Sequence, residues 1–240
     1  MPRETAAPIL ELIDVYAAYG RITILHGVDL VVPEGSVVAL LGPNGAGKTT
    51  TIKVAAGQLR PKSGCLHVAG RHVNGTTPDA LARAGVCTIP EGRGIFPNLT
   101  VRENLRMVTY SSASLSTIEE RSFERFPILA ERRSQLAGTL SGGEQQMLSI
   151  ARALAVDPTL LMLDEISMGL APKIVEELYE LVAQIAADGV SILLVEQYAH
   201  MAMAVADYVA VMAHGRVTAM GEPGDMEEEL HSAYFGTAAA

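Results

Sequence analysis

The sequence has very little cysteine, which excludes two ways of stabilising a fold. Cys65 and Cys87 are the only two in 240 residues, and neither stands in a CxxC or Cys/His metal-binding spacing. A disulfide framework and a structural zinc site are therefore not expected. We expect two reduced, buried thiols of the kind found in the cytosol.

Long apolar runs and basic residues are also scarce. No uninterrupted apolar stretch approaches the ~20 residues of a transmembrane helix. The first residues, "MPRETAAPILELIDV", have no long apolar core followed by a cleavage site, so we expect no secretory signal. The chain has 18 Lys and Arg against 27 Asp and Glu, a formal net charge of −9. Such a surface repels phosphate backbones, and we expect no nucleic-acid partner.

Short apolar runs are plentiful and indicate an α/β fold. The chain is 49% hydrophobic, enough to bury a sizeable core, and its length favours one large domain spanning residues 1–240. Runs buried on both faces and spaced by helical segments are typical of a mainly parallel sheet with helices packed outside. The runs lie at residues 36–42, 85–90, 160–165, 190–196 and 208–215.

Two segments differ from this pattern. The stretch from about residue 10 to 32 alternates apolar and polar residues between turns, which predicts a small antiparallel sheet. Residues 91–139 contain no strand-like run, and Thr100 with Glu103 forms a capping-box pattern that Ser116 and Glu119 repeat. We expect a helical insertion at 91–139, a nucleotide-binding core at about 8–90 and 140–220, and a tail at 221–240.

Residues 42–49, "GPNGAGKT", match the phosphate-loop pattern G-x-x-x-x-G-K-[ST]. They follow an apolar strand and precede a helix starting at Lys48, the context in which backbone N–H groups and a helix N-terminus hold phosphate. Lys48 can reach the β- and γ-phosphates, and the Thr49 hydroxyl can hold Mg²⁺. A plain strand–helix turn is the alternative. The expected nucleotide-binding residues here are Gly42, Asn44, Gly45, Gly47, Lys48, Thr49 and Thr50.

The run "LLMLDE" at 160–165 supplies the usual partner of a phosphate loop. Asp164, at the end of a buried strand, can bind the water shell of the metal, and Glu165 can polarise an attacking water. Acidic pairs at strand ends are common, so this interpretation depends on the phosphate loop being present.

A second glycine-rich turn, "SGGE" at 141–144, allows two interpretations. Ser141 followed by Glu144 is an ordinary helix capping box. Glycines at the first two helical positions, however, each cost roughly 1 kcal/mol relative to alanine, and they would let an anion approach the backbone closely.

The motifs "GPNGAGKTT", "LSGGEQQ" and "LLMLDE", in this order, resemble those of ABC ATPases, and the resemblance covers nearly the whole chain. It implies a P-loop NTPase fold that binds and hydrolyses ATP with Mg²⁺. In that family two ATPase domains pair head to tail, and each ATP lies between the phosphate loop of one and the signature of the other. Ser141, Gly142 and Gly143 would then face a nucleotide held by a partner chain, and residues 169–171 would cross to the partner's site.

The same resemblance assigns roles to single residues. Tyr19 stands where the family places an aromatic that stacks on adenine, with a sheet-surface tyrosine as the alternative and Tyr16 as a competitor. Glu91 replaces the usual glutamine and can bind Mg²⁺ or its water but cannot donate a hydrogen bond when ionised. Gln197 replaces the usual histidine and can bond a phosphate without becoming cationic. His200 is expected to be an ordinary helix histidine.

"PEGRGIFPNLTVRENL", "DEISMGLAP", "LLVEQ" and the late "AYFG" resemble the shorter ATP-binding subunit of bacterial branched-chain amino-acid importers, although Ile166 stands where proline is usual. This implies a peripheral protein on the cytoplasmic face of the inner membrane. Its partners would be a second ATPase chain, different or identical, transmembrane permease subunits, and indirectly a substrate-binding protein. The helical insertion would receive a short helix of the permease.

Two other functions remain open from the sequence. A soluble ABC ATPase of DNA repair or translation would carry a long coiled-coil insertion or two ATPase units, and neither is evident. A nucleotide-binding scaffold without turnover is disfavoured by Asp164 and Glu165. No residue of this chain would contact the transported substrate, so the sequence does not identify that substrate.

Overall fold

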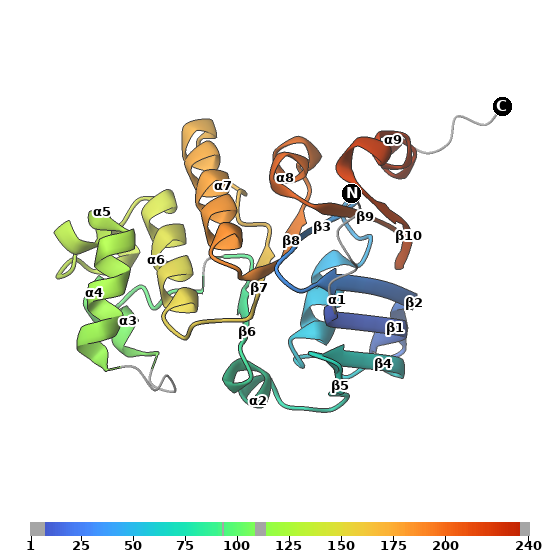
Figure 1. Cartoon of the computed structure of the whole chain (residues 1–240), viewed down its shortest axis with the longest axis horizontal. Coiled ribbons are helices and arrows are strands. Elements are labelled where there is room, and N and C mark those ends of the chain that lie inside the picture. The colour runs from blue at the N-terminus through green and yellow to red at the C-terminus, as the bar shows by residue number, and fades with distance from the viewer. Residues whose placement is uncertain (1–7, 93, 109–113, 236–240) are drawn as a thin grey trace.

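A computed structural model describes residues 8–92, 94–108 and 114–235, and these form two sheets and their covering helices (Figure 1). The larger sheet has the strand order β10-β9-β3-β8-β7-β6, and all its pairs are parallel except β10 with β9. The predicted α/β fold with a mainly parallel sheet is confirmed. Its strands are β3 (Val37–Leu41), β6 (Val86–Ile89), β7 (Leu160–Asp164), β8 (Ser191–Glu196), β9 (Tyr208–Ala213) and β10 (Arg216–Gly221).

The central strands read as continuous apolar runs because both of their faces are covered. Every residue of β3, β7 and β8 is buried. Successive residues of β3 face opposite sides: Val38 and Leu40 pack with α1 (Lys48–Ala55) and the smaller sheet, whereas Val37, Ala39 and Leu41 face the other helices. Because β3, β8 and β7 are parallel neighbours, their carboxyl ends lie side by side.

The smaller sheet is antiparallel, as the alternating pattern of residues 10–32 predicts. Its order is β2-β1-β4-β5. The two later strands, β4 and β5, are not evident from the sequence. Its strands are β1 (Pro8–Tyr19), β2 (Ile22–Pro33), β4 (Ser63–Val68) and β5 (Arg71–His72), and α2 (Pro78–Arg83) follows.

Between β6 and α6 (Gly142–Leu154), the described residues form short helices joined by turns and irregular segments, and no strand. Its elements are α3 (Val101–Arg106), α4 (Leu115–Arg125), α5 (Pro127–Glu131) and the 3₁₀ helix η1 (Ala137–Thr139), with one isolated bridge between Thr100 and Leu136. Figure 1 shows α3, α4 and α5 gathered at one end of the molecule. The division into core 8–90 and 140–220, insertion 91–139 and tail 221–240 stays a prediction; residues 236–240 lie outside the described part.

One of the two predicted capping boxes is present. Thr100 caps α3 and exchanges hydrogen bonds with Glu103. The box predicted at Ser116 is wrong, because Ser114 lies upstream and caps α4 by accepting from the Thr117 N–H at 3.2 Å. Glu119 instead pairs with Arg102 of α3, at 2.6 Å.

The last helices pack against the face of the larger sheet that Val37, Ala39 and Leu41 line. They are α7 (Pro172–Ala187), α8 (Ala199–Val205), the 3₁₀ helix η2 (Pro223–Asp225) and α9 (Glu227–Phe235). Within the described ranges, no helix is long and apolar enough to cross a bilayer. Both cysteines are free thiols, and burial raises the pKa of the Cys87 thiol to about 11. Cys65 is only half-buried in β4, so the expectation of two buried thiols is wrong for it.

Candidate nucleotide-binding site

The phosphate-loop motif joins β3 to α1, as the pattern requires. Gly47 caps α1 with φ 112°, a left-handed conformation that favours glycine. A Cβ on Gly42 would lie 2.1 Å from the carbonyl oxygen of Met212 in β9, so only glycine fits there. Asn44 and Gly45 are exposed at the tip of the loop, whereas Thr50 is buried.

Lys48 folds back over its own loop. Its Nζ donates to the carbonyl oxygens of Gly42 at 2.8 Å and Pro43 at 3.1 Å, and lies 3.9 Å from Oε1 of Glu165. The lysine is 4% exposed, and this burial lowers the pKa of its ammonium even though Glu165 and Asp164 act in the opposite direction. A cation held at the mouth of the loop can bind phosphate oxygens.

Thr49 and Asp164 meet across the site. The Thr49 hydroxyl lies 3.4 Å from Oδ1 of Asp164 at the end of β7. Burial raises the pKa of Asp164 to about 6; the Thr49 hydrogen bond opposes this, and the negative charges of Glu165 and Glu91 add to it. Glu91, which is exposed, lies close enough to Asp164 for its charge to act on that carboxyl group.

Glu165 leaves β7 in an unusual backbone conformation. Its φ of 48° is in the left-handed region, which costs a non-glycine residue on the order of 1–3 kcal/mol. Its N–H donates to the Val195 carbonyl at 2.9 Å, and the next residue, Ile166, is buried. These contacts aim a side chain that is 15% exposed toward Lys48.

Gln197 follows β8, whose last residue pairs with Leu41 of β3, so it lies next to the start of the phosphate loop. Glu196 before it is fully buried and accepts hydrogen bonds from the N–H of Ser167 at 3.1 Å and its hydroxyl at 3.0 Å. Burial raises the pKa of Glu196. His200 is an exposed residue of α8, in agreement with its interpretation as a helix histidine.

Tyr19 and Tyr16 are placed differently at the end of β1. Tyr19 is 45% exposed, and Lys53 of α1 lies 5.7 Å from the centre of its ring. Tyr16 is partly buried, and its ring lies close to Gly27 of the neighbouring strand. Of the two, Tyr19 is the more exposed residue.

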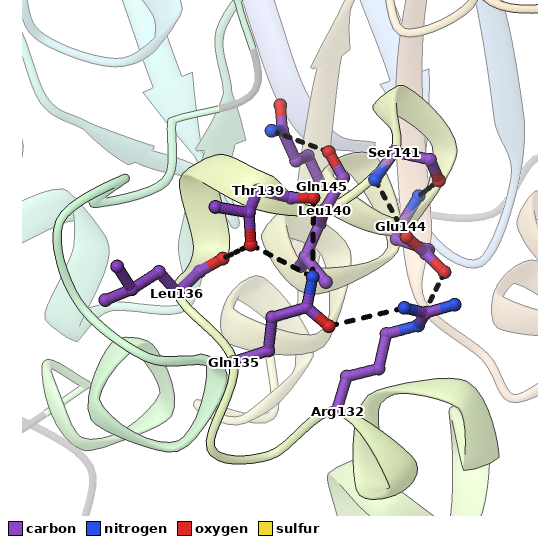
Figure 2. A network of polar contacts seen from close by, with 8 residues as sticks. All are labelled: Arg132, Gln135, Leu136, Thr139, Leu140, Ser141, Glu144 and Gln145. Atoms are coloured by element: carbon purple, nitrogen blue, oxygen red, sulfur yellow. Dashed lines mark hydrogen bonds and ion pairs between the residues drawn. The ribbon is translucent and has the colours of Figure 1, made fainter.

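The second glycine-rich turn opens α6, and Figure 2 shows its polar contacts. Ser141 caps the helix: its N–H donates to Glu144 at 2.8 Å, and its hydroxyl accepts from the Glu144 N–H at 3.4 Å. Glu144 also pairs with Arg132 at 2.8 Å. A Cβ on Gly143 would lie 2.5 Å from Cγ2 of Ile174 in α7, so packing between helices also requires glycine there.

The structure brings together the phosphate loop, Asp164, Glu165, Glu91 and Gln197, but not Ser141. In Figure 1, α6 and α1 lie on opposite sides of β7. Residues 169–171 form the connection to α7, ending at its N-cap, Ala171.

Sequence reasoning missed Ser167, Glu196 and Tyr234, which hold the strand ends by hydrogen bonds. Only the resemblance of "AYFG" pointed toward Tyr234, and it gave no contact.

The sequence and the fold both match known proteins. A family described as ABC transporter matches residues 25–167. The chain is 42% identical over 201 residues to the high-affinity branched-chain amino acid transport ATP-binding protein BraG of Pseudomonas aeruginosa, covering 83% of this chain and 86% of that protein. It is 36% identical over 229 residues to the Nod factor export ATP-binding protein I of Cupriavidus pinatubonensis, covering 94% and 70%.

Among solved structures, the ADP conformation of MJ1267, an ATP-binding cassette of an ABC transporter, has the same fold. Its TM-score is 0.85 at 25% identity, and the match covers 95% of this chain and 99% of that one. The motifs, their arrangement at the strand ends and these similarities agree. The chain belongs to the ABC transporter family, as one of its ATP-binding subunits that hydrolyse ATP.

Proposed function

We propose that this chain powers the import of branched-chain or related amino acids by hydrolysing Mg-ATP. The observation that supports it most is the meeting of Lys48, Thr49, Asp164 and Glu165 at the carboxyl ends of β3 and β7, on either side of β8. The amino-acid class rests on the similarity to BraG.

The phosphate loop holds the triphosphate of ATP. The loop begins at Gly42, and its backbone N–H groups at Asn44, Gly45 and Gly47, with the start of α1 at Thr50, surround the phosphates. Lys48 exchanges its two carbonyl partners for the β- and γ-phosphate oxygens. Tyr19 stacks on the adenine with its exposed ring.

The donors around Thr49 fit Mg²⁺. A hydroxyl and a carboxylate oxygen lie 3.4 Å apart, and Mg²⁺ in such sites binds one or two protein oxygens together with phosphate oxygens and water. The described residues contain no cluster of three or more His, Cys, Asp or Glu that could hold a metal without the nucleotide. Thr49 and Asp164 would hold the ion or its water, and Glu91 would add a further carboxylate close to them. Bound there, Mg²⁺ neutralises charge on the phosphates.

Hydrolysis uses the side chains that surround the γ-phosphate. Glu165 orients a water, whose oxygen attacks the γ-phosphorus while the bond to the β–γ bridging oxygen breaks, giving ADP and inorganic phosphate. Gln197 donates its amide to a γ-phosphate oxygen. Lys48 stabilises the charge that develops on the phosphate oxygens.

The signature turn serves another nucleotide. Ser141, Gly142 and Gly143 open α6, away from α1, and they contact the ATP held by the phosphate loop of a second ATPase chain. Residues 169–171 lie at the same junction. That second chain is a different subunit or a second copy.

The permease docks on a hollow beside the helical insertion. The hollow lies between β6, α2, α6 and the residues that follow α3, and its walls include Thr88, Pro90, Met107, Val108 and Arg152. The assembly sits on the cytoplasmic face of the inner membrane, and a substrate-binding protein reaches it only through the permease. A soluble repair or translation ATPase gains no support: α7, at 16 residues the longest helix described, is far too short for a coiled-coil arm.

The test begins with Glu165→Gln in the purified chain. The turnover of this variant falls to background while Mg-ATP still binds. Its mass in solution shows whether ATP makes two copies of the chain pair, or whether the chain stays a monomer that requires a different partner chain. Retained turnover rejects the catalytic assignment. Uptake of leucine, isoleucine and valine by vesicles containing the permease and this chain, but not the E165Q variant, tests the substrate class.

A further inference from the structure

We propose that Tyr234 is a positioning residue for ATP hydrolysis, because its hydroxyl ties the first residue of the phosphate loop to residue 197. The proposal rests on the roles given to the phosphate loop and Gln197 under the proposed function. Tyr234 lies in α9, far along the chain from both partners.

One hydroxyl makes both contacts. Tyr234 donates its O–H to the carbonyl oxygen of Gln197 at 2.7 Å, and its oxygen accepts the Gly42 N–H at 3.2 Å. Only a group that both donates and accepts can bridge an N–H and a carbonyl in this way, and a phenol has both capacities.

The bridge stands where two strands separate. The parallel ladder of β3 and β8 ends at the pair Leu41 and Glu196. Gly42 and Gln197 are the next residues on the two strands, and beyond them the chain leads to α1 on one side and α8 on the other. Tyr234 therefore fixes the spacing of the two segments that are to grip the same γ-phosphate.

The surroundings of Tyr234 keep its hydroxyl neutral. Partial burial raises the pKa of the phenol, and the negative charges of Glu196 and Glu165 act in the same direction, whereas the Gly42 N–H opposes them. A phenolate could accept from Gly42 but could not donate to Gln197, so the neutral form preserves both contacts.

The backbone at 196–197 is held from a second side as well. The buried carboxylate of Glu196 accepts two hydrogen bonds from Ser167, in the segment that follows Glu165. With Tyr234 on the next carbonyl, the peptide is clamped while the Gln197 side chain stays partly exposed. A side chain on a fixed backbone is what orientation of a phosphate requires.

Tyr234→Phe removes the hydroxyl and keeps the ring. We expect kcat for ATP to fall about 3- to 10-fold, the size of a lost hydrogen-bond bridge, with KM for ATP changed less than about 2-fold because Tyr234 touches no nucleotide. In the Gln197→Ala background the same change should have no further effect on kcat, because the group it positions is gone.

Hydrogen exchange gives a second readout that does not depend on turnover. Exchange should speed up in peptides covering residues 36–44 and 193–198 of the Y234F variant. Tyr208→Phe is the matched control: Tyr208 begins β9, and among the described residues its hydroxyl has no hydrogen bond to Gly42 or Gln197. It should leave both kinetics and exchange unchanged.

Unchanged kcat in Y234F, an equal fall in both backgrounds, or unchanged exchange each overturns the proposal. A fall in kcat accompanied by an equal loss in Y208F does so too, because it indicates general destabilisation. Failure of the proposed function looks different: E165Q would retain turnover, or the unaltered chain would have none even when paired with its second ATPase chain, while exchange still reports on the bridge.

Discussion

The two glycine-rich turns of this chain are built in opposite ways. The loop at 42–47 is anchored in the interior at both ends, although its tip is exposed: Gly42 packs against β9, and Lys48 bonds to the loop's own carbonyls. The turn at 141–144 opens α6. Ser141 is exposed there, and Arg132 forms an ion pair with Glu144.

The difference indicates what each turn needs. The first lies beside two acids of its own chain, Asp164 and Glu165, which the proposed hydrolysis uses. The second is built from the capping groups of a helix N-terminus and the ion pair of Arg132 with Glu144, as Figure 2 shows. A turn built in this way is suited to complete a site on another chain.

The largest effect is expected from E165Q. Removing the group that orients water should lower kcat by about 10²- to 10⁴-fold without weakening Mg-ATP binding, as measured by phosphate release and calorimetry. The exposed Glu180 on α7 gives the matched control, since E180Q should change neither. A fall of less than tenfold would contradict the assignment of Glu165.

Gly42→Ala tests how tightly the first turn is enclosed. Its Cβ would lie 2.1 Å from a backbone oxygen of Met212, so we expect a loss of about 1–3 kcal/mol in unfolding free energy and weaker ATP binding. Gly224→Ala, where a Cβ would meet no atom within 4 Å, should be near neutral. Equal melting temperatures for the two variants would show that the loop can yield.

Gly143→Ala separates packing from phosphate contact at the second turn. The clash with Ile174 should destabilise the chain by about 1–3 kcal/mol, and Ile174→Ala should relieve part of that loss. If the double variant regains its melting temperature but hydrolyses ATP poorly in the assembled pair, Gly143 is also needed at the phosphate. Full recovery of both would leave packing as the only reason for glycine.

The smallest effect is expected from Arg132→Ala. The ion pair with Glu144 is partly exposed, with the Arg132 side chain 39% exposed, so its loss should cost at most about 1 kcal/mol in denaturant unfolding. Nucleotide binding by the unpaired chain should not change, and Arg133→Ala provides the control. Weakened binding in the unpaired chain would mean that the two turns are coupled within one molecule.

The sequence predicts best what lies within short, continuous motifs. The strand before Gly42, the helix from Lys48 and the acids after β7 follow from local patterns, because each needs only its neighbours in sequence. The Ser116 cap fails because Ser114, two residues earlier, competes for the same helix end. The Tyr234 bridge joins residues 192 positions apart, and no local pattern encodes such a contact.

The central claim is that the two turns hold two different nucleotides, and binding of Mg-ADP to the unpaired chain tests it most directly. Lys48→Ala removes the cation of the first turn and should weaken binding about 10- to 100-fold by calorimetry. Ser141→Asp keeps a helix cap but puts a carboxylate where the second turn would meet phosphate. The account predicts that S141D binds within about 2-fold of the unaltered chain, because that phosphate belongs to a partner. Equal weakening in both variants would contradict it and place one nucleotide on both turns of a single chain.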